Sequence, residues 1–542
     1  MFRVKNSLSD TSLKSTFLLR RRMLQSSYFL ITGIILAALS LRIWSAFSDP
    51  PYIFHPDEPN HVTTIQNILK TGDLNPHFFN YPSMFIYVNA LAYIPYYLAG
   101  KFYGMFTTID DVISPTIENM GTAFTQSPGS IELDRSVTIL FATASVLLIF
   151  FIGRRLTKNQ WVGLIAAFMM AVSPTSVYNS RFTTPDTFLV FWALLTFFTA
   201  ILILQEGKKS HYILAGLFAG FTISSKYNGA LIMLTVIGAH FFRTGWTGVR
   251  DRKIYLACLM CLLGFILITP FSFLDYKYFL KAIKSEAIHY AIGHPGMEGD
   301  AALWYIKYLW NIEGIACLLA LVQILRGFYK HSRETMLLSV FVIPYFIFIS
   351  SYVVRNDRTL LPDIPFIFLL CAILIVDLYS FKLSFLHPKR RVLIKGVAVL
   401  IMTVTFVIPL KNTIKDSIER TTIDSRTTAR VWLNRYLPDG AKVAIESYSP
   451  FVNPARFKVS SFSRMIDNSS QWYIDNGFDY LVFSQGMFAR FYHNPKNYKN
   501  EINSYESFFH TFNHVKSFTD GGYEIRVYKI NKDNMNTANN ST

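Results

Sequence analysis

The sequence predicts an α-helical polytopic membrane protein with about eleven transmembrane helices, followed by a small α/β domain. Of its 542 residues, 51% are hydrophobic and only 16% are charged, whereas a typical soluble domain has roughly 25% charged residues. Apolar runs long enough to cross a bilayer recur along the chain. Lys and Arg gather between these runs, as in cytoplasmic loops, so the net charge of +17 indicates membrane topology and not nucleic-acid binding.

The first apolar run follows a basic N-terminus. Residues 1–26 are expected to be cytoplasmic, and 27–47 to be a permanent span, because no clear signal-peptide cleavage site follows it. The stretch 212–242 begins and ends near basic clusters, so we expect it to cross the membrane twice, with Lys226 near the outer turn. The other expected spans are 136–153, 161–179, 186–205, 254–273, 306–326, 335–352, 359–379 and 391–410. Residues 27–411 would thus form the transmembrane domain.

The first outer loop, 48–135, contains an apolar segment at 84–107. If this segment crossed the membrane, every later basic cluster would lie outside, so we expect an interfacial or re-entrant helix. The odd number of spans places the C-terminus outside. Residues 412–530 have turn residues and short apolar runs, which predict an extracytoplasmic α/β domain. Residues 531–542 are expected to be disordered.

Metal and disulfide chemistry have little support in the sequence. All four cysteines lie in apolar segments, and the Cys258/Cys261 pair has no second pair to complete a metal site. His55 and His61 flank two acids and could bind a metal with them, but their spacing is not diagnostic. We therefore expect no metal and no cofactor, and expect these histidines to be interfacial or to face a substrate.

The first outer loop carries two adjacent carboxylates, Asp57 and Glu58. A short amphipathic helix follows, and we expect Glu58 to be its N-cap, Pro59 its first residue and Gly72 its end. Acids often serve only as helix caps at such a place. However, further ionisable residues lie at the outer ends of the expected spans, where charge is costly and often functional. These residues are Arg135, Arg181, Asp186, Lys226 and Arg358.

Carboxylates and cations on one membrane face suit sugar transfer from a lipid phosphate. A phosphate leaving group needs positive charge and no general acid. The attacking hydroxyl or amine needs a carboxylate to accept its proton. In an inverting transfer, this base lies on the sugar face opposite the leaving group.

The order of these motifs resembles the superfamily of protein O-mannosyltransferases and aminoarabinose transferases, which are membrane C-fold glycosyltransferases. The resemblance covers residues 27–380 and is strongest over 54–230. The motifs are the acidic pair, Asn80-Tyr81-Pro82-Ser83, Arg135, Ser-Arg-x-x-x-Pro-Asp at 180–186, Ser-Lys-Tyr-Asn-Gly at 225–229, and Arg-x-x-x-Pro-x-x-Pro from Arg358.

The resemblance implies a transmembrane glycosyltransferase domain with its active site on the extracytoplasmic side of a plasma or inner membrane. It makes Asp57 the general base and Glu58 its partner, which orients the base or binds sugar. Residues expected to bind substrate are His55, Tyr81, Arg135, Arg181, Asp186, Lys226 and Arg358, with Arg358 near the phosphate and Asp186 holding Arg181. The implied donor is a polyprenyl-phosphate sugar, and the acceptor can be a glycan, a lipid or a protein.

Two departures from the superfamily concern the substrates. Aminoarabinose transferases have a Lys-Pro pair where this chain has Tyr81-Pro82, so another cation must bind the phosphate. The mannosyltransferases insert a large β-trefoil module late in the chain, for which this sequence has no room. Two other functions are compatible with a polytopic chain. A transporter or lipid flippase would usually show two matching halves, and a membrane assembly protein would not need the outward cations.

Overall fold

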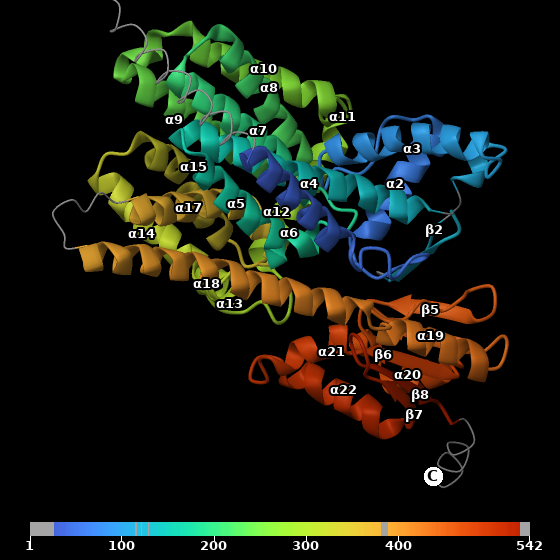
Figure 1. Ribbon diagram of the computed structural model, residues 1–542. Coiled ribbons are helices and arrows are strands. Elements are labelled where there is room, and N and C mark those ends of the chain that lie inside the picture. Colours follow the sequence, from blue (N-terminus) through green and yellow to red (C-terminus); the bar gives the residue numbers. More distant parts are fainter. Residues whose placement is uncertain (1–25, 114–115, 121, 128, 381–387, 532–542) are drawn as a thin grey trace, which may run out of the picture.

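The computed structural model describes residues 26–113, 116–120, 122–127, 129–380 and 388–531. A large helical part is followed by a smaller C-terminal part that contains both helices and strands (Figure 1). The predictions of a basic cytoplasmic segment at 1–26 and of a disordered tail at 531–542 fall almost entirely outside the described residues. The long helix α18 (Pro388–Thr421) runs along the helical part and leads into the C-terminal part (Figure 1).

The helical part begins with the helix Ser26–Ile43. Its remaining helices before α18 are α2 (Glu58–Thr71), α3 (Met84–Phe102), η1 (Ile109–Asp111), α4 (Ser130–Thr157), α5 (Gln160–Val172), α6 (Pro174–Asn179), α7 (Asp186–Gln205), α8 (Lys209–Ser225), η2 (Tyr227–Ile232), α9 (Met233–Thr244), η3 (Trp246–Arg250), α10 (Arg252–Ile268), α11 (Phe271–Leu274), α12 (Tyr276–Ile292), α13 (Ala301–Ile312), α14 (Ala316–Tyr329), α15 (Arg333–Ser350), α16 (Asp357–Leu360) and α17 (Ile364–Ser380).

Helix α17 lies at the centre of the largest hydrophobic core. Every residue from Ile364 to Val376 is buried, as expected for a helix that is apolar on all sides and has protein neighbours all round. Small residues let other helices approach closely. A Cβ atom on Gly163 of α5 would lie 2.3 Å from the carbonyl oxygen of Phe150 on α4, and one on Gly220 of α8 would lie 2.4 Å from that of Cys261 on α10. Such close backbone contacts are typical of membrane helix pairs.

Five helices among the described residues are long and apolar enough to cross a membrane, or six if the bent pair α13–α14 forms one span. The chain is therefore an integral membrane protein, while the total of eleven spans stays a prediction. The stretch 212–242, which we expected to cross twice, contains two helices, α8 and α9. The chain leaves α8 at Lys226, as expected for the turn between them.

The described residues of the first outer loop form helices α2 and α3, the short 3-10 helix η1 and a small sheet. Strands β1 (Tyr52–Ile53), β2 (Thr116–Asn119) and β3 (Thr122–Thr125) pair antiparallel in the order β1-β3-β2. The segment expected to be interfacial contains helix α3, which is not one of the five candidate spans. Helix α2 ends at Gly72, as predicted, because this glycine adopts the left-handed conformation with φ 71°.

The C-terminal part is a mixed five-stranded sheet with helices packed against it. Its strands are β4 (Lys442–Glu446), β5 (Lys458–Phe462), β6 (Tyr480–Ser484), β7 (Asn513–Phe518) and β8 (Ile525–Lys529), in the order β5-β4-β6-β8-β7. Strand β4 pairs parallel with β5 and with β6. Strand β8 pairs antiparallel with β6 and with β7. The helices are α19 (Ser425–Tyr436), η4 (Met465–Asp467), α20 (Ser470–Asp475), α21 (Gln485–Tyr492) and α22 (Lys499–Thr511).

Hydrogen bonds fix the C-terminal part and α18 against the helical part. Thr122 of β3 donates to the carbonyl oxygen of Ser449 at 2.7 Å, and Asn119 donates to that of Val452 at 2.8 Å. On α18, Thr413 donates to the carbonyl oxygen of Val172 at 2.7 Å. The C-terminal part thus lies directly beside the loop that carries Asp57.

Candidate active site

The carboxylate of Asp57 lies at the start of helix α2. We expected Glu58 to cap this helix, but the helix begins one residue earlier, with Asp57 as the N-cap and Glu58 in the first turn. The Asp57 side chain makes no cap hydrogen bond. It instead accepts a hydrogen bond from the guanidinium of Arg358. The backbone therefore positions this carboxylate, while its oxygens remain available to a distant part of the chain.

Asp57 and Arg358 line a cavity of about 340 Å³, which we call the Asp57 cavity. Burial alone would raise the pKa of Asp57, but the positive charge of Arg358 and its hydrogen bond hold that pKa below its usual value. For Arg358, the facing Tyr81 and Asp57 outweigh burial and raise the pKa. Both groups are therefore charged at neutral pH, and the cavity contains an acceptor of protons beside a fixed cation.

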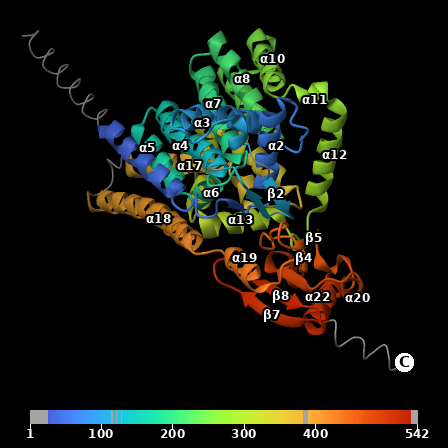
Figure 2. The ribbon, with the colours of Figure 1, turned by 90° about the vertical axis from the view of Figure 1, so that its right-hand side faces the viewer.

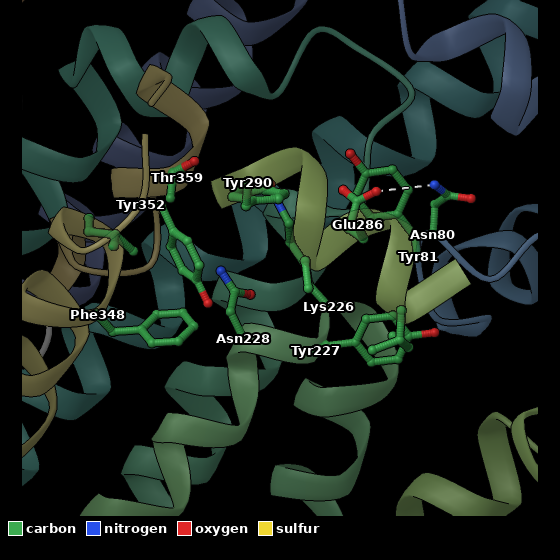
Figure 3. Close-up of a pocket in the computed structure, with 13 residues that line it drawn as sticks. Asn80, Tyr81, Lys226, Tyr227, Asn228, Glu286, Tyr290, Phe348, Tyr352 and Thr359 are labelled. Carbon is green, nitrogen blue, oxygen red and sulfur yellow. Dashed lines mark hydrogen bonds between the residues drawn. The ribbon is translucent and has the colours of Figure 1, made fainter. Parts of the chain in front are cut away.

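A second cation lies in an adjoining cavity of about 190 Å³, the Lys226 cavity. Lys226 is nearly buried and donates to Asp186 at 2.8 Å, and its Nζ lies 5.6 Å from the ring centroid of Tyr81. Figure 3 shows Lys226 in the middle of this lining. Four residues line both cavities: Asn80, Tyr81, Glu286 and Tyr290. The structure therefore brings Asp57, Arg358, Tyr81 and Lys226 into one continuous site.

Asp186 has a different partner from the one we expected. The sequence resemblance implied that it holds Arg181, but it pairs with Lys226. Arg181 instead donates to Asp416 at 2.6 Å and to Ser417 at 2.5 Å, both on α18. Arg181 is thus part of the contact between helix α18 and the helical part, and it does not line the Asp57 or Lys226 cavity.

Glu58 and Arg135 also lie outside both cavities. Arg135 forms a double hydrogen bond with the carboxylate, at 2.9 and 2.8 Å, and both side chains are at most 2% exposed. The backbone N–H of Thr183 donates to the same carboxylate at 2.7 Å. This buried pair joins α2, α4 and the 181–185 turn, so its geometry suits holding Asp57 in place more than touching a substrate.

His55 and the adjacent Pro56 line a third cavity, of about 760 Å³, the His55 cavity. It lies between the helical part and the C-terminal part, which contributes Tyr448, Arg490 and Tyr523. Burial lowers the pKa of His55, so its imidazole is neutral at pH 7. The ring packs against Phe182, with 4.5 Å between the centroids, and its Nδ1 accepts from the Asp57 backbone N–H at 3.2 Å. One dipeptide therefore separates Asp57 from this large polar cavity.

His61 lies among aromatic rings, with Tyr81 and Phe85 each 5.2 Å away between centroids. Burial lowers its pKa to about 4. Across the described ranges, no group of three or more His, Cys, Asp or Glu side chains is placed to hold a metal ion.

Sequence reasoning missed the part of the lining that comes from helix α12. Glu286, His289 and Tyr290 line the Asp57 cavity, and Glu286 accepts from Asn80 at 3.1 Å. These residues are spaced i, i+3 and i+4, so a helix presents them on one face. That spacing was a detectable signal, but α12 has no buried residue, and none of the motifs on which the sequence resemblance rests falls within it.

Comparisons with known proteins agree with this architecture. A family model described as dolichyl-phosphate-mannose-protein mannosyltransferase matches residues 130–270. No curated protein sequence matches the chain.

Two solved structures illustrate the structural similarity. The oligosaccharyltransferase AglB from Archaeoglobus fulgidus, in complex with an inhibitory peptide and a dolichol-phosphate, is similar with a TM-score of 0.58 and 12% identity, covering 94% of this chain and 74% of that one. ArnT from Cupriavidus metallidurans bound to undecaprenyl phosphate is similar with a TM-score of 0.52 and 11% identity, covering 92% and 97%. At such low identity, the similarity shows a shared fold: the expected helical C-fold is confirmed, while the number of eleven transmembrane helices stays a prediction.

Proposed function

We propose that this chain, which has the fold of the membrane C-fold glycosyltransferases, transfers a sugar from a polyprenyl phosphate to an acceptor on the extracytoplasmic side. One observation carries the proposal. The carboxylate of Asp57 and the cations Arg358 and Lys226, which are far apart in the sequence, line cavities that meet at Asn80 and Tyr81. This is the combination of base and phosphate-binding charge that such a transfer needs.

In the proposed reaction, an oxygen or nitrogen of the acceptor attacks the anomeric carbon of the donor sugar. The bond between that carbon and the phosphate oxygen breaks, and its electron pair leaves with the phosphate. The proton of the acceptor passes to Asp57. Because attack and departure occur on opposite faces of the ring, the transfer inverts the anomeric centre.

Arg358 and Lys226 would stabilise the departing phosphate. Each has a carboxylate partner in the structure, Asp57 and Asp186 respectively. A bound phosphate offers competing oxygens, and guanidinium groups bind phosphate with two parallel hydrogen bonds. When Arg358 turns from Asp57 to the phosphate, Asp57 loses the charge that lowers its pKa and becomes a stronger base. Donor binding would thereby activate the base.

The acceptor would approach through the His55 cavity. This cavity opens beside the C-terminal part and is lined by charged and aromatic groups, among them Arg420, Tyr178 and Tyr523. Arg420 lies over the ring of Tyr178, 4.3 Å from its centroid. Such a lining suits a polar acceptor rather than a lipid tail. The donor and the acceptor would then meet at Asp57 from two sides.

The test is turnover by the purified full-length chain in nanodiscs. The protein is incubated with undecaprenyl phosphate carrying mannose, glucose, galactose or 4-amino-4-deoxyarabinose, together with an envelope extract as acceptor, and released undecaprenyl phosphate is measured. We expect one donor to be consumed, and Asp57→Asn to lower its turnover by about 10²–10⁴-fold. Asp73→Asn, a change of an exposed acid in the same loop, is the matched control and should be active. Unchanged turnover in Asp57→Asn would refute the assigned base.

A further inference from the structure

Helix α12 forms a wall of the candidate active site, although none of its residues is fully buried. Figure 2 shows it along the side of the helical part, apart from the other helices. Polar contacts hold it at both ends. Near its end, the carbonyl oxygen of Tyr290 accepts from the N–H groups of Val353 and Val354 at 3.1 and 3.3 Å. The helix is thus fixed in place, and its polar residues have defined positions.

Two carboxylates of this segment bind the first outer loop in the same way. Asp275, the N-cap of α12, accepts from the side chain of Asn75 at 3.1 Å, and Glu286 accepts from that of Asn80 at 3.1 Å. The two acids differ in what they face. Glu286 lines both the Asp57 cavity and the Lys226 cavity, whereas Asp275 lines neither. A role in tethering α12 explains both contacts, but it does not explain the position of Glu286.

Glu286 lines the space that a donor sugar would occupy. The sugar carbon that is attacked must lie near Asp57, and the sugar ring must extend from there toward the cation of the second cavity, Lys226. The residues common to both cavities are Asn80, Tyr81, Glu286 and Tyr290, and Glu286 is the acid among them. Figure 3 shows its carboxylate beside Asn80 and the ring of Tyr81.

We propose that Glu286 is a specificity-determining residue that accepts a hydrogen bond from a ring hydroxyl of the donor sugar. This inference rests on the proposed function. The side chain of Asn80 donates a hydrogen bond to Oε2 of Glu286 and fixes the orientation of the carboxylate. The second oxygen can then accept a hydrogen bond from one hydroxyl of the sugar ring. A hydrogen bond to a charged acceptor discriminates strongly against a sugar that lacks the hydroxyl, because the carboxylate then loses its partner.

The experiment compares Glu286→Gln with Asp275→Asn as the matched control. Both changes remove a negative charge from the same helix and keep an oxygen for the neighbouring Asn. The substrates are the undecaprenyl-phosphate sugar that the wild type consumes and its monodeoxy analogues, each lacking one ring hydroxyl. We expect Glu286→Gln to lower kcat/KM for the complete donor by about 10–100-fold, and Asp275→Asn to change it by no more than about twofold.

The analogues separate recognition from support of the fold. In the wild type, one deoxy analogue should react about 10–100-fold more slowly than the complete donor. In Glu286→Gln that same analogue should react as fast as the complete donor, because the lost contact cannot be lost twice. Equal losses in Glu286→Gln and Asp275→Asn, or additive losses for every analogue, would overturn the role of Glu286. A wild type that consumes none of the lipid-linked donors would instead overturn the proposed function.

Discussion

Substituting Glu58 with Gln tests whether this buried acid supports the site or takes part in the chemistry. Glu58 is fully buried and has three hydrogen bonds, two from Arg135 and one from the Thr183 N–H. Gln has nearly the same shape, but it presents an amide N–H₂ to the guanidinium and leaves the charge of Arg135 buried and unpaired. Removing one partner of a buried ion pair costs about 3–5 kcal/mol.

The measurement is the apparent melting temperature of the purified protein in one detergent, at a fixed scan rate because such unfolding is often irreversible. We expect Glu58→Gln to melt several degrees below the wild type, and Asp57→Asn to melt close to it. Arg135→Gln should also lower the melting temperature. The double variant Glu58→Gln/Arg135→Gln should lower it by less than the sum of the two single changes, because neither side chain is then left with an unpaired buried charge.

The pH dependence of this pair has a defined sign. The charge of Arg135 and the hydrogen bonds outweigh burial and lower the pKa of Glu58. The stabilisation is therefore present above the usual glutamate pKa, and it is lost as the pH falls through the lower pKa of the folded state. A Glu58→Gln protein that melts like the wild type but has lost turnover would refute this reasoning and make Glu58 part of the reaction.

Three further predictions concern separate parts of the molecule. Lys226→Met should lower kcat/KM for the lipid donor by about 10²-fold. Lys226→Met should also lower the melting temperature, because it leaves Asp186 without its partner. The double variant Lys226→Met/Asp186→Leu should recover the melting temperature of the wild type but not its turnover; recovery of both would show that Lys226 only supports the fold. In the C-terminal part, burial raises the pKa of Glu446 to about 7. The folded state keeps this proton while the unfolded state loses it, so stability should fall by about 3 kcal/mol between roughly pH 4.5 and 7. Glu446→Gln should abolish that fall in pH-dependent melting curves, whereas an unchanged pH dependence would contradict the assignment. Met105 follows α3 and is exposed. In the variant Met105→Cys, the introduced thiol should react with an impermeant thiol reagent that is applied from outside. Labelling only after lysis would show that the predicted topology is inverted there.

The sequence revealed much of the fold because hydrophobic length and charge asymmetry are properties of local segments. The polar interruption at Lys226 predicted two helices within 212–242, and the structure has α8 and α9 there. Helix α17 shows the limit of this reasoning. It is as apolar as a lipid-facing span, and only its packing shows that protein surrounds it on all sides.

The candidate site was partly predictable because ordered motifs identify residues that meet in space. Asp57, Tyr81, Lys226 and Arg358 were named from the sequence and share one continuous site. The pairing of charges was not predictable. Asp186 lies five residues from Arg181 but pairs with Lys226, since the choice depends on how the turn at 181–185 faces its neighbours.

Arg135 and Arg181 illustrate the same limit. Both stand at span ends, as a substrate-binding cation would, yet they have buried carboxylate or helix partners away from the two cavities. The α12 residues were missed for the opposite reason. Glu286 belongs to a helix without buried residues, so hydrophobic periodicity carried little information about which of its faces meets the site.

The most direct measurement of the central claim is an experimental structure of the full chain in nanodiscs with undecaprenyl phosphate bound. We predict that the phosphate lies within hydrogen-bond distance of Lys226 and Arg358, and that Arg358 has left the carboxylate of Asp57. A phosphate bound elsewhere, with the pairs Arg358–Asp57 and Lys226–Asp186 intact, would contradict the account.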